Sequence, residues 1–154
     1  MRISSQLLVS APKERVSAYL RDLKHLPDYD KKVSEALVIR QDADTAELSA
    51  SGMFLGRAWK DSPKVRFAKD GGYECSFVLG RLTKMTAVYH VRPVTGGTLL
   101  AHEEVYDVSV LLRPVLLAAR GWLLQAIEAE MRVIKEGAQA VDRQAKLKEI
   151  DSLA

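Results

Sequence analysis

Apolar and polar residues alternate along most of the chain before Pro114, and this period of two predicts β-strands. A first strand is expected at residues 2–10, RISSQLLVS, and further alternating runs follow from Val33 onward. Turn signals separate these runs: DAD at 42–44, KDGG at 69–72 and VTGG at 94–97. About seven strands result, and their tight turns make them antiparallel.

Two segments instead repeat apolar residues at three- and four-residue steps, which predicts helices. The first spans residues 13–23, directly after Pro12, and a further helical turn is expected near Pro27. The second runs from Pro114 to about residue 147, with this apolar stripe: Ala119, Leu123, Ile127, Met131, Ile134, Ala138 and Val141. Gly121 and Gly137 interrupt this helix, and each costs about 1 kcal/mol of helix stability relative to alanine. A close approach of helix and sheet, a bend in the helix or a tolerated imperfection would each explain them.

Length and composition indicate one domain at residues 1–147 followed by a tail at 148–154. The 154 residues are 47% hydrophobic and 28% charged, as in ordinary globular proteins. The formal net charge of +3 is spread among many acids, so no nucleic-acid-binding stripe is expected. No signal peptide is evident at the start, and the longest apolar run, residues 115–127, is short for a membrane span. The sequence therefore indicates a cytoplasmic protein.

Three stretches are similar to one known superfamily. They are VSAPKERVSAYLRDLKHLPDYDKKV at 9–33, VYHVRPVTGGTLLAHEEV at 88–105 and AIEAEMRVIKEGAQ at 126–139. Together they resemble the START, polyketide cyclase and pollen-allergen (SRPBCC) superfamily. That resemblance implies an α+β helix-grip fold, a curved antiparallel sheet wrapped on a long C-terminal helix. Superfamily members bind lipids, polyketides, plant steroids or quinones and some are cyclases, but they share no catalytic motif that could be carried over.

The last predicted hairpin contains the run His102-Glu103-Glu104, and its register decides which acid points inward. If residues 94–97 form the loop, Tyr89 faces His102, and the inward set is Leu100, His102, Glu104, Tyr106 and Val108. A loop one residue longer would turn these outward and bury two acids, Glu103 and Asp107. We expect the first register because it buries one acid.

Tyr89, His102 and Glu104 would then form a polar triad on a mostly apolar wall. The simplest interpretation is a solvated rim without a role. The alternatives are a group that orients a ligand's carbonyl or hydroxyl and, after that, acid–base chemistry. The residues expected to line a ligand cavity are Tyr89, His102, Glu104, Tyr106, Met85, Tyr73, Phe77, Arg57, Trp59, Leu123 and Ile127.

Other chemistry finds little support in the sequence. Cys75 stands alone, which excludes an intramolecular disulfide, and it is expected to be an inert buried thiol. The pair His102-Glu103 does not extend to a zinc motif because position 106 is Tyr, so no metal is expected. No nucleotide-binding or nucleophile motif is present, and no cofactor is expected. An outward Arg57 remains an alternative to the cavity, and Trp122 is either a gate at the cavity mouth or a packing residue.

The expected function is therefore non-catalytic binding or transport of a small, mostly apolar molecule in a cavity between sheet and helix. The alternative is a cyclase- or dehydratase-like enzyme that uses His102 and Glu104 as acid–base groups. A third possibility is an interaction module, because VLLAARGWLL at 115–124 could be buried in a homodimer or in peripheral contact with a membrane. No membrane span and no nucleic-acid partner are expected.

Overall fold

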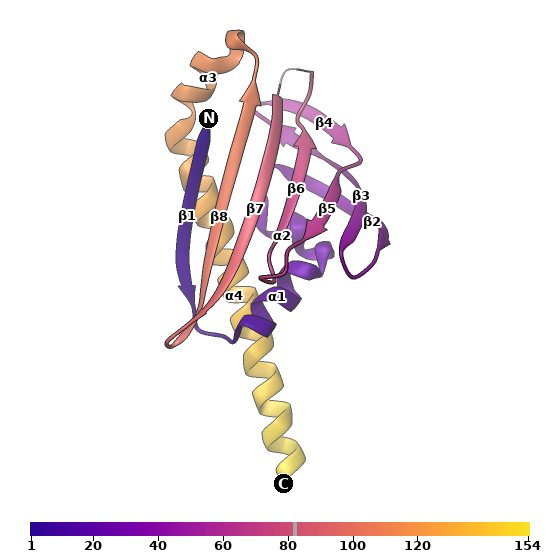
Figure 1. Cartoon of the computed structure of the whole chain (residues 1–154), viewed down its shortest axis with the longest axis vertical. Coiled ribbons are helices and arrows are strands. Elements are labelled where there is room, and N and C mark those ends of the chain that lie inside the picture. The colour runs from indigo at the N-terminus through magenta and orange to yellow at the C-terminus, as the bar shows by residue number, and fades with distance from the viewer. Residues whose placement is uncertain (82) are drawn as a thin grey trace.

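The computed structural model describes residues 1–81 and 83–154, which form a curved antiparallel sheet wrapped on a long helix (Figure 1). The strands are β1 (Arg2–Val9), β2 (Val33–Gln41), β3 (Thr45–Phe54), β4 (Arg57–Asp61), β5 (Lys64–Phe67), β6 (Tyr73–Val78), β7 (Thr83–Val94) and β8 (Gly97–Val108). Their order is β1-β8-β7-β6-β5-β3-β2, with β4 paired to β3. This is the expected helix-grip fold.

The described strands number eight, one more than expected, because two short breaks divide the middle of the chain. Leu55 and Gly56 both adopt positive φ, 48° and 76°, and turn the chain from β3 into β4. Ser62 and Pro63 then separate β4 from β5, since proline cannot donate a ladder hydrogen bond.

The helices are α1 (Lys13–Arg21), η1 (Leu23–His25), α2 (Leu26–Tyr29), η2 (Val110–Leu112), α3 (Arg113–Ala118) and α4 (Arg120–Leu153). The predicted C-terminal helix is therefore two helices, which meet at Ala119 with a bend of 65°. Of the helices described, no single one is long and apolar enough to span a bilayer; η2–α3 and α4 pass that test only as a bent pair.

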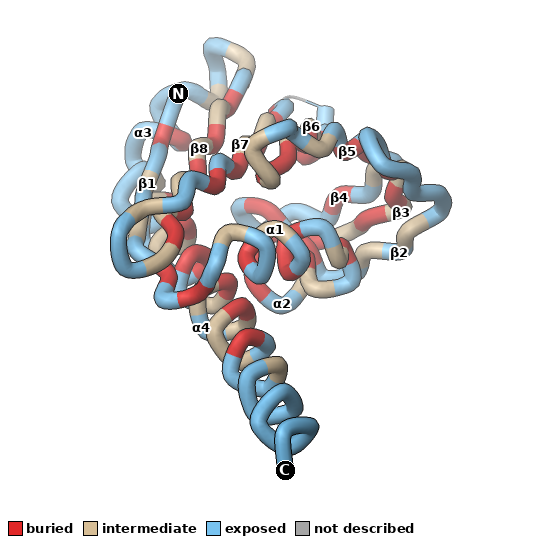
Figure 2. The backbone as a smooth tube through the Cα atoms, turned by 60° about the horizontal axis from the view of Figure 1, so that its bottom comes forward, coloured by how far each residue is buried: buried red, intermediate tan, exposed pale blue. Residues whose placement is uncertain are grey.

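The far end of α4 differs from the expectation in two ways. Val141 is 41% exposed and the neighbouring Asp142 is buried, since the helix turns its polar side toward Arg15 of α1 at this point. Residues 148–153, expected as a tail, continue the helix, which projects as an exposed rod from the body (Figures 1 and 2).

The register of the last hairpin agrees with the first of the two expected registers. Pro93 pairs with Thr98, Tyr89 with His102, Ala87 with Glu104 and Met85 with Tyr106. The ladder continues to Val94 and Gly97, so the loop itself is shorter than expected. His102, Glu104 and Tyr106 consequently lie on the buried face of β8, while Glu103 faces outward.

Gly137 and Gly121 of α4 have different surroundings, and this predicts opposite effects of alanine. A Cβ on Gly137 would overlap the Tyr19 ring of α1, whereas nothing lies within 4 Å of a Cβ on Gly121. We expect Gly137→Ala to lower the free energy of unfolding by about 1–3 kcal/mol through overpacking. Gly121→Ala should raise it by up to about 1 kcal/mol. Urea unfolding of both variants tests this, and equal effects would contradict the close approach.

Candidate functional site

Three polar side chains of β8 lie inside the protein. His102, Glu104 and Tyr106 are 1%, 0% and 2% exposed, because alternate residues of this strand face α4. The interpretation of these residues as a solvated rim is therefore wrong. The Tyr106 hydroxyl donates a hydrogen bond to Oε2 of Glu104. Nε2 of His102 lies 3.3 Å from Oε1 of the same Glu104 carboxylate.

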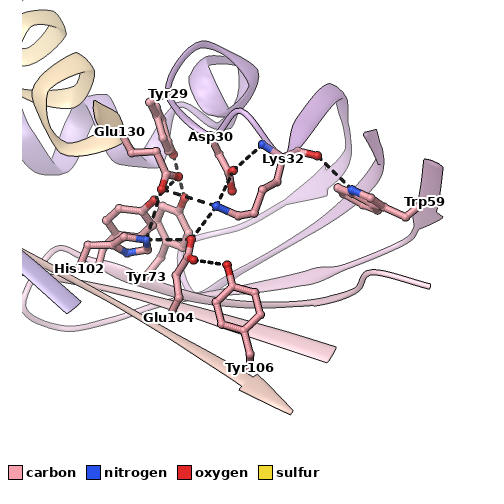
Figure 3. A network of polar contacts seen from close by, with 10 residues as sticks. Tyr29, Asp30, Lys32, Trp59, Tyr73, His102, Glu104, Tyr106 and Glu130 are labelled. Carbon is pink, nitrogen blue, oxygen red and sulfur yellow. Dashed lines mark hydrogen bonds and ion pairs between the residues drawn. The ribbon is translucent and has the colours of Figure 1, made fainter. Parts of the chain in front are cut away.

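Lys32 reaches the same place from the turn between α2 and β2 (Figure 3). The turn is fixed by Asp30, whose N–H donates to the Leu26 carbonyl and whose Oδ1 accepts from the Lys32 N–H. The Trp59 indole donates to the Lys32 carbonyl at 3.0 Å. These bonds direct the lysine side chain inward, where it is 4% exposed.

The ammonium of Lys32 faces three carboxyl groups. Its Nζ lies 2.7 Å from Glu104 Oε1, 3.0 Å from Asp30 Oδ1 and 3.6 Å from Glu130 Oε2. Burial alone would lower the pKa of Lys32, but the neighbouring carboxylates outweigh it and hold this pKa well above its usual range. Lys32 is therefore a fixed buried cation.

Glu104 is its matching anion. Burial alone would raise the pKa of Glu104, but Lys32 and the His102 hydrogen bond outweigh it and lower the pKa to about 2. A carboxyl group with so low a pKa is a poor proton donor at neutral pH. Glu104 is thus a structural anion that holds Lys32 in place.

Glu130 of α4 is the opposite case. Burial and then the charge of Asp30 raise the pKa of Glu130 well above its usual range. Lys32 opposes this rise and Glu104 adds to it, and the net shift favours the protonated form. Its Oε1 accepts a long hydrogen bond of 3.5 Å from the Tyr89 hydroxyl. Within the described part of the chain, its Oε2 is buried without a hydrogen-bond partner. Its nearest nitrogens are Lys32 Nζ at 3.6 Å and His102 Nε2 at 3.8 Å. Buried polar atoms are rarely left without a hydrogen bond, so this oxygen lacks a close partner.

The expected triad is brought together, but in a different arrangement. Tyr89 stacks on His102 with ring centroids 3.9 Å apart, and its hydroxyl points to Glu130 instead of Glu104. His102 donates from Nδ1 to the Val88 carbonyl at 3.1 Å. His102 and Tyr89 thus pack beside the Lys32–Glu104–Glu130 group and position its members.

A pocket of about 400 Å³ opens from the surface beside this group. It lies between the start of α4, the β3–β4 turn and the turn that carries Lys32. Its lining residues are Lys31, Lys32, Met53, Leu55, Gly56, Ala119, Trp122, Leu123, Ala126 and Glu130. Apolar side chains form most of the wall, while Lys32 and Glu130 supply buried polar groups, and Trp122 is half exposed.

The expected cavity residues occupy several different places. Most are packed into a filled interior: Met85, Tyr73, Phe77, Trp59, Ile127 and Tyr89 are at most 5% exposed. Leu123 lines the pocket described above, and Tyr106 lines a smaller one of about 350 Å³ beside α3. Arg57 is exposed, because it begins β4 at the molecular surface. Cys75 is buried, and burial raises the pKa of its thiol far above the usual range, as expected for an inert thiol.

Metal ligation was expected to be absent on the basis of spacing along the chain, but spacing cannot reveal Glu130. Donor atoms of His102, Glu104 and Glu130 all lie within 4.8 Å of one another. These residue types suit a transition-metal ion. However, the Lys32 ammonium already supplies a cation 2.7 Å from Glu104, and a metal would have to displace it.

The protonated state of Glu130 predicts a pH-dependent stability. A carboxyl group whose pKa is raised by folding contributes less stability as pH rises above its ordinary value of 4.5. The free energy of unfolding of Glu130→Gln should therefore rise, relative to that of wild type, by up to about 1.4 kcal/mol per pH unit above about pH 5. Glu104 does not change the free energy of unfolding with pH in this range, because its stabilising effect disappears only as pH falls toward 2. Urea unfolding of both proteins between about pH 5 and about pH 8 measures this; a constant difference would contradict it.

Sequence reasoning missed Asp30, Lys32 and Glu130. For Glu130 a signal existed: it lies between Ile127 and Ile134 at steps of three and four, on the predicted apolar stripe. A charged residue on that stripe must find a buried partner. For Lys32 the run DYDKKV gave no comparable sign, because nothing in it tells which lysine points inward.

Comparison with known proteins places this geometry in context. A family model described as polyketide cyclase / dehydrase and lipid transport matches residues 1–139. No curated protein matches the sequence. Among solved structures, a protein of Thermus thermophilus is similar with a TM-score of 0.76 and 15% identity, over 92% of this chain and 99% of that one.

Two further structures show the range of proteins with this fold. The Zhui aromatase/cyclase of Streptomyces sp. R1128 has a TM-score of 0.70 at 11% identity, over 90% of this chain and 93% of that one. A STAR-related lipid transfer protein of Xanthomonas axonopodis has a TM-score of 0.65 at 8% identity, over 90% of this chain and 85% of that one. The resemblance found in the sequence is confirmed, and the chain belongs to the polyketide cyclase/dehydrase and lipid transport family.

Proposed function

We propose that the protein binds a small, mostly apolar molecule in the pocket at the start of α4, through an acceptor oxygen such as a carbonyl. One observation carries this proposal: Lys32 and Glu130 lie in the wall of an otherwise largely apolar pocket. Lys32 is a donor because it is cationic, and the raised pKa of Glu130 favours the protonated form, which is also a donor. The pocket volume, about 400 Å³, lies in the range of about 300–1,000 Å³ common for small-molecule sites.

Oε2 of Glu130 supports the same proposal, because it makes no hydrogen bond and lies 3.6 Å from the Lys32 ammonium. A ligand carbonyl beside Lys32 and Glu130 would accept from both, while its apolar part would lie against Met53, Leu123 and Trp122. The interior farther along the sheet is filled by tyrosines that pair or stack with one another, as Tyr29 and Tyr73 do through a 2.8 Å hydrogen bond. The ligand would therefore occupy only the pocket at the start of α4, because the filled interior beyond it would limit the ligand's length.

A matched set of probes tests this proposal: a long-chain methyl ketone, the primary amine of the same length and the parent hydrocarbon. Trp122 lines the pocket, so its fluorescence can report occupancy, with Trp122→Phe as the control for the signal from Trp59. After correction for partitioning, the ketone should bind roughly 10- to 100-fold more tightly than the hydrocarbon. The amine should bind worst because it meets Lys32. Equal binding of ketone and hydrocarbon would contradict the proposal.

A second candidate function is favoured by the raised pKa of Glu130. A protonated carboxyl at a pocket wall is positioned as a general acid for a cyclisation or dehydration. The acid would be Glu130, not the expected pair of His102 and Glu104, since neither of those lines the pocket and Glu104 has a low pKa. An enzyme of this kind would lose turnover in Glu130→Gln while still binding its substrate, whereas a pure carrier would show no turnover in wild type.

A further inference from the structure

Large apolar side chains are exposed on η2, α3 and the start of α4, next to the pocket-lining segment at 119–126, and at the end of β3. Six of them are at least half exposed: Met53, Val110, Leu111, Val115, Leu117 and Trp122. We call them the mouth surface. The helices η2 and α3, which carry four of the six, bury only Leu116 in the body. In Figure 1 they form one corner of the molecule, beside the start of β1. Apolar exposure on this scale marks an interaction site.

The charge around the mouth surface has one sign. Residues 31–32, 51–60 and 108–127 contribute to this end of the molecule, and none of them is Asp or Glu. Four acids stand at the borders of these segments, Asp30, Asp61, Asp107 and Glu128, and the buried Glu130 lines the pocket itself. The same segments contain five exposed cations, which are Lys31, Arg57, Lys60, Arg113 and Arg120. The segments that carry the exposed apolar side chains thus have cations and no acids within them.

We infer that the mouth surface docks on an anionic lipid bilayer, with its apolar side chains in the interfacial region and the exposed cations of these segments at the headgroups. Apolar burial and attraction to anionic lipid are the two contributions that such interfacial binding needs. A second copy of the chain fits less well, since a symmetric dimer would bring Arg113 and Arg120 against the same basic surface. This inference goes beyond the proposed function, because it does not depend on what the pocket holds.

Flotation with lipid vesicles tests the inference directly. We expect the protein to float with vesicles of phosphatidylcholine and phosphatidylglycerol at low salt, and to float far less with phosphatidylcholine alone or at high salt. Leu111 is 83% exposed, so Leu111→Glu should fold normally and weaken binding at least about tenfold. The control is Leu37→Glu on β2, a side chain 65% exposed at the opposite edge of the sheet, which should bind like wild type.

Three results would overturn the inference. Wild-type protein could stay in solution with the anionic vesicles at low salt. The control Leu37→Glu could lose as much binding as Leu111→Glu, which would mean that any added negative charge acts through the net charge. Light scattering could show a dimer that Leu111→Glu dissociates, and the occupant of the mouth surface would then be a second copy.

Discussion

Lys32→Met should lower the free energy of unfolding by about 3–5 kcal/mol at neutral pH, because it leaves buried acids without their cation. Asp30 and Glu104 both lie within 3.0 Å of the lysine nitrogen, and each is at most 2% exposed. Methionine fills a similar volume, so lost packing contributes little. Urea unfolding measures the change.

Two further variants separate the charge effect from general damage. Lys31→Met removes an exposed neighbouring lysine and should change stability by no more than about 0.5 kcal/mol. In the double variant Lys32→Met, Glu104→Gln the unpaired acid is also neutralised. Its destabilisation should fall short of the sum of the single variants by about 0.5–3 kcal/mol. Additive effects would show that Lys32 and Glu104 are not coupled.

The second large effect is expected on ligand binding. Ala126 lines the pocket and is half-buried on α4, so Ala126→Phe would place a ring in the space proposed for the ligand. Affinity for the methyl ketone should fall at least about 100-fold, or about 2.7 kcal/mol. Isothermal titration calorimetry measures this without relying on tryptophan fluorescence.

The same helix offers a matched control. Ala129 lies one turn further on and is exposed, so Ala129→Phe adds the same ring outside the pocket. This variant should bind the ketone like wild type. If Ala126→Phe also bound normally while remaining folded, the ligand would lie somewhere other than the pocket at the start of α4.

The fold was largely predictable because its signals are local. The VTGG turn sets the register of β7 and β8, and that register alone places His102, Glu104 and Tyr106 inside. The bend at Ala119 was not predictable, since apolar residues continue on both sides of it. The turn at Leu55 was missed because a leucine at positive φ is uncommon.

The site was predictable only in part because it is assembled from three distant segments. The acid on β8 could be identified from strand period, but its partners come from the turn at Lys32 and from α4 at Glu130. Which acid keeps its proton depends on the distances among these groups, and no sequence pattern contains those distances. The filled interior depends likewise on how Tyr29, Tyr73 and Tyr89 pack against one another.

The central claim is that Lys32 and Glu130 donate hydrogen bonds to the oxygen of a bound ligand. Infrared spectroscopy of the bound methyl ketone, carbon-13 labelled at the carbonyl, tests it most directly. In wild-type protein the carbonyl band should lie at lower frequency than in hydrocarbon solvent, and Glu130→Leu should move it partly back. A band at the hydrocarbon position in wild-type protein would contradict the claim.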